Sequence, residues 1–165
     1  MKKTRTKILA GVVLLIAVLL ITGIAWAKAT KTSIAGHMQV IPGASVDRHW
    51  IDDEGIEHYR GLTASLLLLD GPLVGTGSAV VNINVDPFGN GDESGAVTLD
   101  VTWGDLNGTF EGRLSATYIG GISYSSTVYH GTGDFEGMKM KVNATMSFAD
   151  FVAAYEGIIL DPHGE

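Results

Sequence analysis

The sequence predicts an all-β domain, a closed antiparallel β-barrel of about eight strands, preceded by one N-terminal apolar helix. Three observations lead to this prediction. Apolar and polar residues alternate with a period of two in most segments after residue 33. Short Gly-rich turns separate these segments, and none of them has a helical period apart from a turn or two in residues 149–155. The same pattern is compatible with a β-sandwich, which is the alternative architecture.

A basic N-terminal stretch precedes a long apolar run. Four Lys and Arg residues lie within the first seven positions, and residues 8–21 carry no polar side chain. This order is typical of an export signal. Ala25-x-Ala27 fits a cleavage site, while residues 8–27 have the length of about 20 residues that spans a bilayer. Residues 1–27 are therefore either a signal peptide cleaved near Ala27 or a transmembrane signal anchor, and the domain is extracytoplasmic, secreted or membrane-anchored.

The domain after the leader is acidic and has no cysteine. The chain contains 11 Lys and Arg against 18 Asp and Glu, and four of the basic residues belong to the leader. The remaining formal charge of −11 repels nucleic acid and anionic membrane surfaces, so neither is expected as a partner of the domain. Without cysteine there is no disulfide, no thiolate nucleophile and no thiol-linked lipid.

Alternation and turn residues place the strands within residues 34–161, after a polar linker at residues 28–33. The first strand covers residues 34–40 and stops at Pro42-Gly43. Residues 64–69 are apolar on both faces, which indicates a strand covered from two sides or the densest part of the core. The later strands are expected at residues 78–85, 97–103, 109–118, 122–129, 138–148 and 154–160.

Residues 46–51 and 56–62 predict a hairpin, because the turn sequence Asp-Asp-Glu-Gly separates them. If Ile51 pairs with Ile56, His49 faces His58 and Asp47 faces Arg60 across the two strands. A slip by one residue sets two arginines against each other instead. The first register is the electrostatically preferable one.

A frame of two glycines around a central apolar residue, Gly-x-Φ-x-Gly, begins at Gly71, Gly104, Gly108 and Gly133. The spacings between copies are unequal, which excludes a solenoid. Glycine kinks at strand starts let a sheet coil strongly enough to close, and this favours the barrel over the sandwich. The inward positions change phase after Gly133, so a β-bulge is expected there.

The stretch Gly131-Thr132-Gly133-Asp134-Phe135 resembles the Gly-Gly-Thr-Gly-x-Phe sequence near the C-terminus of dirigent proteins, which are relatives of the allene oxide cyclase barrel. His130 replaces the first glycine of that sequence. The resemblance implies an exported eight-stranded antiparallel barrel with a mouth large enough for a ligand. It carries over no catalytic residue.

The predicted hairpin carries the first group of candidate site residues, Asp47, His49, His58 and Arg60, on one face. Two facing histidines beside a carboxylate have the chemistry to bind a divalent metal or a ligand, or to act as a base at a barrel mouth. The competing interpretation is a solvated hairpin face with one ion pair, because no third metal ligand has a fixed spacing to the two histidines.

A second candidate group lies in the loop after residue 85. Asp86, Asn90, Asp92 and Glu93 supply oxygen ligands of the kind that calcium takes, and glycines between them allow a tight loop. The spacing lacks the terminal bidentate glutamate of the helix-flanked calcium loop. An ordinary polar turn is the alternative interpretation. Outside this loop, Asn107 and Asn143 begin glycosylation sequons.

No nucleophile elbow, phosphate-binding loop or His-Glu-x-x-His motif occurs in the sequence. The function predicted is therefore a non-catalytic ligand-binding or cell-surface interaction module. The alternatives are a small barrel enzyme of the cyclase or isomerase type acting on an apolar small molecule, and a structural envelope protein. These functions differ in whether the barrel interior is filled by side chains or left open.

Overall fold

The computed structural model describes residues 29–43 and 45–164, so the predicted leader and the predicted cleavage site near Ala27 lie outside the described residues. The described chain forms one antiparallel sheet of nine strands and contains no helix. Consequently, it contains no helix that could span a membrane. The strands are β1 (Thr30–Pro42), β2 (Arg48–Ile51), β3 (Glu57–Leu68), β4 (Val74–Val85), β5 (Gly91–Trp103), β6 (Leu106–Ile119), β7 (Ile122–Gly133), β8 (Lys139–Ser147) and β9 (Val152–Asp161).

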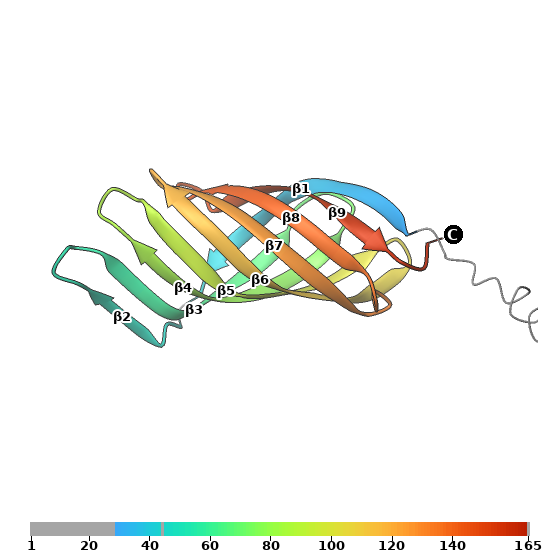
Figure 1. Ribbon diagram of the computed structural model, residues 1–165, viewed down its shortest axis with the longest axis horizontal. Coiled ribbons are helices and arrows are strands. Elements are labelled where there is room, and N and C mark those ends of the chain that lie inside the picture. Colours follow the sequence, from blue (N-terminus) through green and yellow to red (C-terminus); the bar gives the residue numbers. More distant parts are fainter. Residues whose placement is uncertain (1–28, 44, 165) are drawn as a thin grey trace, which may run out of the picture.

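Eight of the strands form a ring. The sheet order is β1-β9-β8-β7-β6-β5-β4-β3-β2, and β1 pairs with β3 as well as with β9 (Figure 1). β1 lies along the second half of β3, and β2 lies along its first half, so the β2–β3 hairpin extends beyond the ring. The all-β antiparallel class is confirmed. β1 begins inside the stretch predicted as a linker, and β9 begins inside residues 149–155, where a helical turn was expected.

The predicted alternation places the core inside the ring. In β8 the side chains of Met140 and Val142 are buried, while Lys139 and Lys141 are exposed on the outside. In contrast, the prediction for residues 64–69 is wrong, because they are the end of β3 and not a separate strand covered on both faces. Leu66 points inward with 7% of its surface exposed, but Leu67 is 42% exposed. The outward-facing apolar side chains at this end of β3 are exposed to solvent.

The predicted hairpin register is also wrong. Ile51 pairs with Glu57, and Arg48 lies opposite Arg60. The two guanidinium groups are tolerated because both lie over the Trp50 ring, at 4.4 and 5.2 Å from its centroid. Arg60 also donates hydrogen bonds to two main-chain carbonyls. Aromatic and main-chain contacts therefore outweigh the repulsion between the two guanidinium groups, on which the predicted register was based.

Three of the glycine frames form turns at one end of the ring, which we call the plugged end. Residues 71–75 connect β3 to β4, residues 104–108 reach from β5 into β6, and residues 133–137 connect β7 to β8. The bulge expected after Gly133 is wrong, because β7 and β8 pair without a register shift and the phase changes in the turn. A register shift occurs instead in β3, where Gly61 has a φ of 66°.

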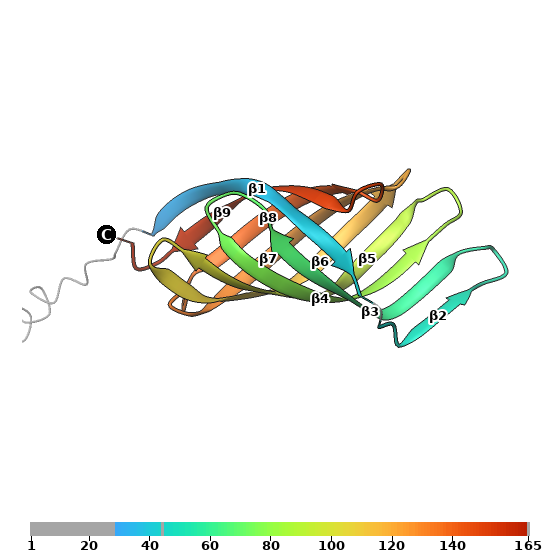
Figure 2. The same cartoon turned by 180° about the vertical axis from the view of Figure 1, so that it is seen from behind.

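Apolar residues at the centres of these turns close the plugged end. Leu73 is buried, and Phe135 has no exposed surface and stacks on Phe110 at 4.7 Å between ring centroids. The described chain also begins and ends here, at the end opposite the β2–β3 hairpin (Figure 2). The other end of the ring, which we call the lid end, is surrounded by the loops after β4, β6 and β8.

Candidate functional site

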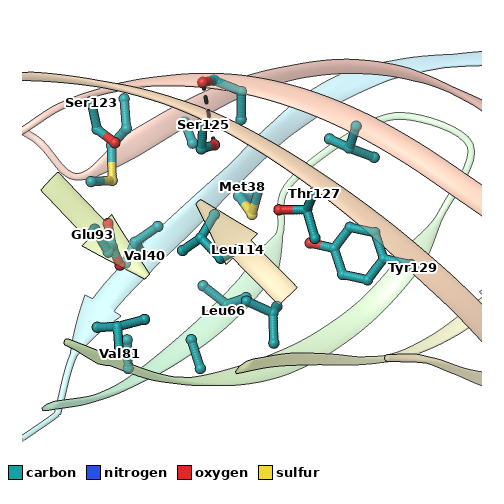
Figure 3. A pocket seen from close by; sticks show the side chains of 17 residues that line it. Met38, Val40, Leu66, Val81, Glu93, Leu114, Ser123, Ser125, Thr127 and Tyr129 are labelled. Atoms are coloured by element: carbon teal, nitrogen blue, oxygen red, sulfur yellow. Dashed lines mark hydrogen bonds between the residues drawn. The ribbon is translucent and has the colours of Figure 1, made fainter. Parts of the chain in front are cut away.

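The ring encloses a cavity of about 90 Å³ between the plugged end and the lid end. All eight ring strands contribute inward-facing side chains to it. Figure 3 shows an apolar wall that includes Met38, Val40, Leu66 and Val81, which come from β1, β3 and β4. The interior of the ring is therefore not completely filled, which is the property that sequence alone left open.

The β7 strand supplies a row of hydroxyl groups to the cavity, Ser123, Ser125, Thr127 and Tyr129. Alternate residues of a strand share a face at a spacing of about 7 Å, so these four side chains all point inward. Ser123 and Thr127 are only 4% and 3% exposed. The Ser125 hydroxyl donates to the main-chain oxygen of Ala144 at 3.4 Å. Burial raises the pKa of Tyr129 to about 12, so its phenol is neutral at physiological pH.

Glu93 on β5 is the single carboxyl group among the seventeen residues that line the cavity. One of its carboxyl oxygens accepts a hydrogen bond of 2.5 Å from the hydroxyl of Tyr118 on β6. Burial raises the pKa of Glu93, because the charged carboxylate loses its hydration among apolar side chains. Burial and the neighbouring carboxyl group also raise the pKa of Tyr118. A buried carboxyl group in a cavity is a frequent sign of a functional site.

The segment between β8 and β9, residues 148–151, crosses the lid end, and we call it the lid segment. Phe148 packs edge-on against Tyr118 with ring centroids 4.9 Å apart, and its N–H donates to the carbonyl of Gly121. At the other side, the carbonyl of Phe151 accepts from the N–H of Val40 at 2.8 Å. Phe151 has a φ of 56°, a backbone conformation that costs roughly 1–2 kcal/mol for such a residue. The segment thus covers Tyr118, the partner of the cavity carboxyl group.

The structure separates the two hairpin histidines onto opposite faces. The His49 ring stacks on Tyr59 at 4.4 Å between centroids, on the face that continues the inner wall of the ring. The His58 ring stacks on Trp50 at 4.6 Å, on the outer face. In this arrangement the two imidazoles do not converge on one ion or ligand.

His58, Arg60 and Asp47 form hydrogen bonds with other residues of the chain. The Nε2 and Nδ1 atoms of His58 contact carboxyl and amide oxygens of Asp52 and Asn84 at 2.9 and 2.8 Å. Arg60 donates to the same Asn84 oxygen at 2.7 Å. Asp47 is not paired with Arg60 by its side chain, although its N–H donates to the main-chain oxygen of Arg60. These contacts hold the hairpin together.

In the loop of residues 86–92 the oxygen atoms accept hydrogen bonds from the protein. Asp86 accepts from the N–H groups of Phe88 and Asn90, which lowers the pKa of its carboxyl group. Asp92 lies on β5 and accepts from the side chain of Asn84 on β4. Within residues 29–43 and 45–164, no three His, Asp or Glu side chains gather in a way that would hold a metal ion.

From the sequence, Glu93 is predicted only as an oxygen ligand of the candidate calcium loop, and Tyr118 and the serine and threonine hydroxyls of β7 are not predicted as site residues. The alternation along the strands contained the information that these residues point inward, because Glu93 shares a face with Val97 and Ser123 shares one with Tyr129. Inward-facing polar residues look like the solvated face of a strand when only the alternation is considered. Comparison of the sequence with protein-family models and with curated proteins gave no match.

Proposed function

We propose that this chain is a non-catalytic binding protein that holds a small, largely apolar molecule inside a closed β-barrel. The ring of eight strands supports the barrel, and one observation carries the function: the interior keeps a cavity whose walls are mostly apolar and whose polar groups are concentrated around one strand. Ligand sites have this composition, with a few polar groups that fix the orientation of an apolar body.

The volume of the cavity limits the ligand. Pockets for drug-sized molecules measure roughly 300–1,000 Å³, and an engineered cavity of about 150 Å³ holds benzene. A space of about 90 Å³ accommodates a molecule of a few heavy atoms in the conformation described. A longer ligand requires displacement of the lid segment, whose strained Phe151 backbone favours such a movement.

The proposed location is extracytoplasmic, either anchored by residues 8–27 or released after cleavage near Ala27. The described chain starts at the plugged end. An anchored domain would therefore have its plugged end toward the membrane and its lid end away from it. The resemblance of Gly131–Phe135 to dirigent proteins remains part of the proposal, although this stretch lies at the plugged end and not at the lid.

A second candidate function, a small barrel enzyme of the isomerase or cyclase type, is favoured by the buried carboxyl group of Glu93. A carboxyl group whose pKa is raised by burial is better suited than an ordinary one to donate a proton to a substrate. Conversion of a bound molecule into an isomer of equal mass would distinguish this function from simple binding.

Native mass spectrometry of the protein purified from its own host tests the proposal. Extra mass that disappears when the chain is denatured is expected, and its value identifies the class of ligand. A native mass equal to that of the denatured chain, also after incubation with an extract of small molecules from the host, would contradict a binding role. The denatured mass also shows whether the chain begins at Met1 or Lys28.

A further inference from the structure

The cavity lining contains no cation. Among the seventeen residues that line it there is no Lys, Arg or His, and its one carboxyl group is that of Glu93. An anionic ligand would lose its hydration without gaining a positive partner, and it would meet this carboxyl group. Carboxylates and phosphates are therefore poor ligands for this cavity.

The polarity of the cavity is one-sided. The hydroxyl row of β7 lies on one side, with Glu93 at the same cavity, and the apolar wall of β1, β3 and β4 lies on the other (Figure 3). Serine and threonine hydroxyls both donate and accept hydrogen bonds, so they pair with an uncharged hydroxyl group in either orientation. A pure hydrocarbon would offer the hydroxyl groups of Ser123 and Thr127 no hydrogen-bond partner in the cavity, whereas an alcohol would.

We propose that the cavity selects a neutral, hydroxyl-bearing hydrocarbon, with its hydroxyl group against the β7 row and Glu93 and its hydrocarbon part against the apolar wall. This inference rests on the proposed binding function and specifies its ligand class. An alcohol is favoured over an amine because an ammonium group is costly to desolvate. Burial, which keeps the Glu93 carboxyl group neutral to a higher pH, also weakens its attraction for a cation.

Four molecules with the same five-carbon chain test the inference: pentanol, pentane, pentylamine and pentanoate. The full chain is held in phospholipid nanodiscs with its methionine methyl groups labelled, and the methyl resonances are followed by NMR at neutral pH. Met38 and Met146 line the cavity, whereas Met138 lies at the plugged end and serves as the control for non-specific effects. Free ligand concentrations are corrected for partition into the lipid.

Pentanol is expected to shift the Met38 and Met146 resonances saturably, with an affinity at least about tenfold higher than that of pentanoate and about three- to tenfold higher than that of pentane and pentylamine. Ser123→Ala should remove the preference for pentanol over pentane. Ser126→Ala, the same substitution on the exposed face of β7, should leave it intact.

The possible failures are distinguishable. Binding of pentanoate as tight as that of pentanol would overturn the argument from charge, and equal binding of pentane would overturn the role of the hydroxyl row. Tighter binding of pentylamine would show a cation site. If none of the four molecules shifts Met38 or Met146, this inference fails, and the native mass spectrum then decides the proposed binding function by itself.

Discussion

Glu93 combines two properties that are costly in a folded protein, an ionisable group and an environment of apolar side chains. Among the residues that the structure describes, its one hydrogen-bond partner is the hydroxyl group of Tyr118, which contacts one of the two carboxyl oxygens. A residue placed only for stability would be expected to be apolar at such a position. We therefore interpret Glu93 as a binding group that is retained at a cost in stability.

Replacement of this group gives a prediction about pH. The pKa of Glu93 is raised above the ordinary value of 4.5 in the folded protein, because burial disfavours the charged form. The folded state then holds the proton more tightly than the unfolded state, so the contribution of Glu93 to the free energy of unfolding falls as the pH rises from about 4.5 through the folded pKa. Above that pKa the loss is constant. Glu93→Gln removes this loss and keeps an oxygen that accepts from Tyr118.

The stability difference between Glu93→Gln and the wild type should therefore increase as the pH rises through this window and then level off. Urea denaturation at a series of pH values measures it, with Glu111→Gln on the exposed face of β6 as the control. A difference that does not change with pH would mean that the Glu93 carboxyl group is solvated in the folded state.

At the scale of the elements, the hairpin formed by β2 and the first residues of β3, up to Arg60, is an interlocked unit that does not contribute to the cavity. His58 lies between Asp52 and Asn84 and stacks on Trp50, whereas the partly exposed His49 has one stacking partner, Tyr59. His58→Ala should lower the melting temperature by a few degrees and His49→Ala should lower it less. Both variants should bind a cavity ligand with wild-type affinity, and loss of binding in either would place the ligand site on the hairpin.

The effect of His58→Ala should depend on pH. The hydrogen bond that the imidazole of His58 donates to the Asp52 carboxylate raises the pKa of His58, and the same bond lowers the pKa of Asp52. The stability from the histidine is complete below its unfolded value of 6.5 and is lost as the pH rises through its folded pKa. The stability from Asp52 is complete above its unfolded pKa of 3.8 and is lost as the pH falls through its folded pKa. The free energy of unfolding of His58→Ala should therefore differ most from that of the wild type between these two pH values.

The strands show which features the sequence can predict. A period of two identifies inward and outward residues from neighbours in the chain, and it placed Met140 and Lys139 correctly. The predicted hairpin register was wrong because it was based on pairs of charged residues alone. In the structure both arginines lie over the Trp50 ring, which stabilises the other register. The glycine frames were assigned to strand starts, but positive φ angles at Gly104 and Gly133 place them in turns.

The site was harder to predict than the strands. A cavity inside a ring depends on how side chains from eight strands fill a common space, and those strands are far apart in the sequence. Small lining residues such as Ala79 and Ala144 are compatible with either a filled or an open interior. The alternation along β5 predicts that Glu93 points inward. Its chemical role depends on the apolar residues from other strands that surround it, and these cannot be read from its neighbours in the sequence.

At the scale of the whole molecule, the two ends of the ring differ in a way that suits one-sided access. Stacked Phe110 and Phe135 and the buried Leu73 fill the plugged end. The lid end is crossed by the lid segment, which connects to its surroundings through main-chain hydrogen bonds, hydrogen bonds from the Gln39 side chain to its carbonyls, and half-buried aromatic rings. A ligand would therefore pass through the lid end, the end away from residue 29, where the described chain begins.

If the interior is open in solution, filling it should stabilise the protein and abolish binding. Ala144→Leu adds three carbon atoms to the cavity wall, and we expect an increase in the free energy of unfolding of about 0.5–2 kcal/mol, as for other cavity-filling substitutions. Ala96→Leu adds the same atoms on the exposed outer face of β5 and should change stability by less than about 0.5 kcal/mol.

Denaturation curves and the pentanol titration, measured on the same samples, decide the outcome. Stabilisation together with loss of the Met38 and Met146 shifts would mean that the cavity is open space that a ligand normally occupies. Destabilisation of about 1–3 kcal/mol would mean that leucine overpacks an interior that is already full. The ring would then be a solid scaffold, and its function would have to lie on the outer surface or on the β2–β3 hairpin.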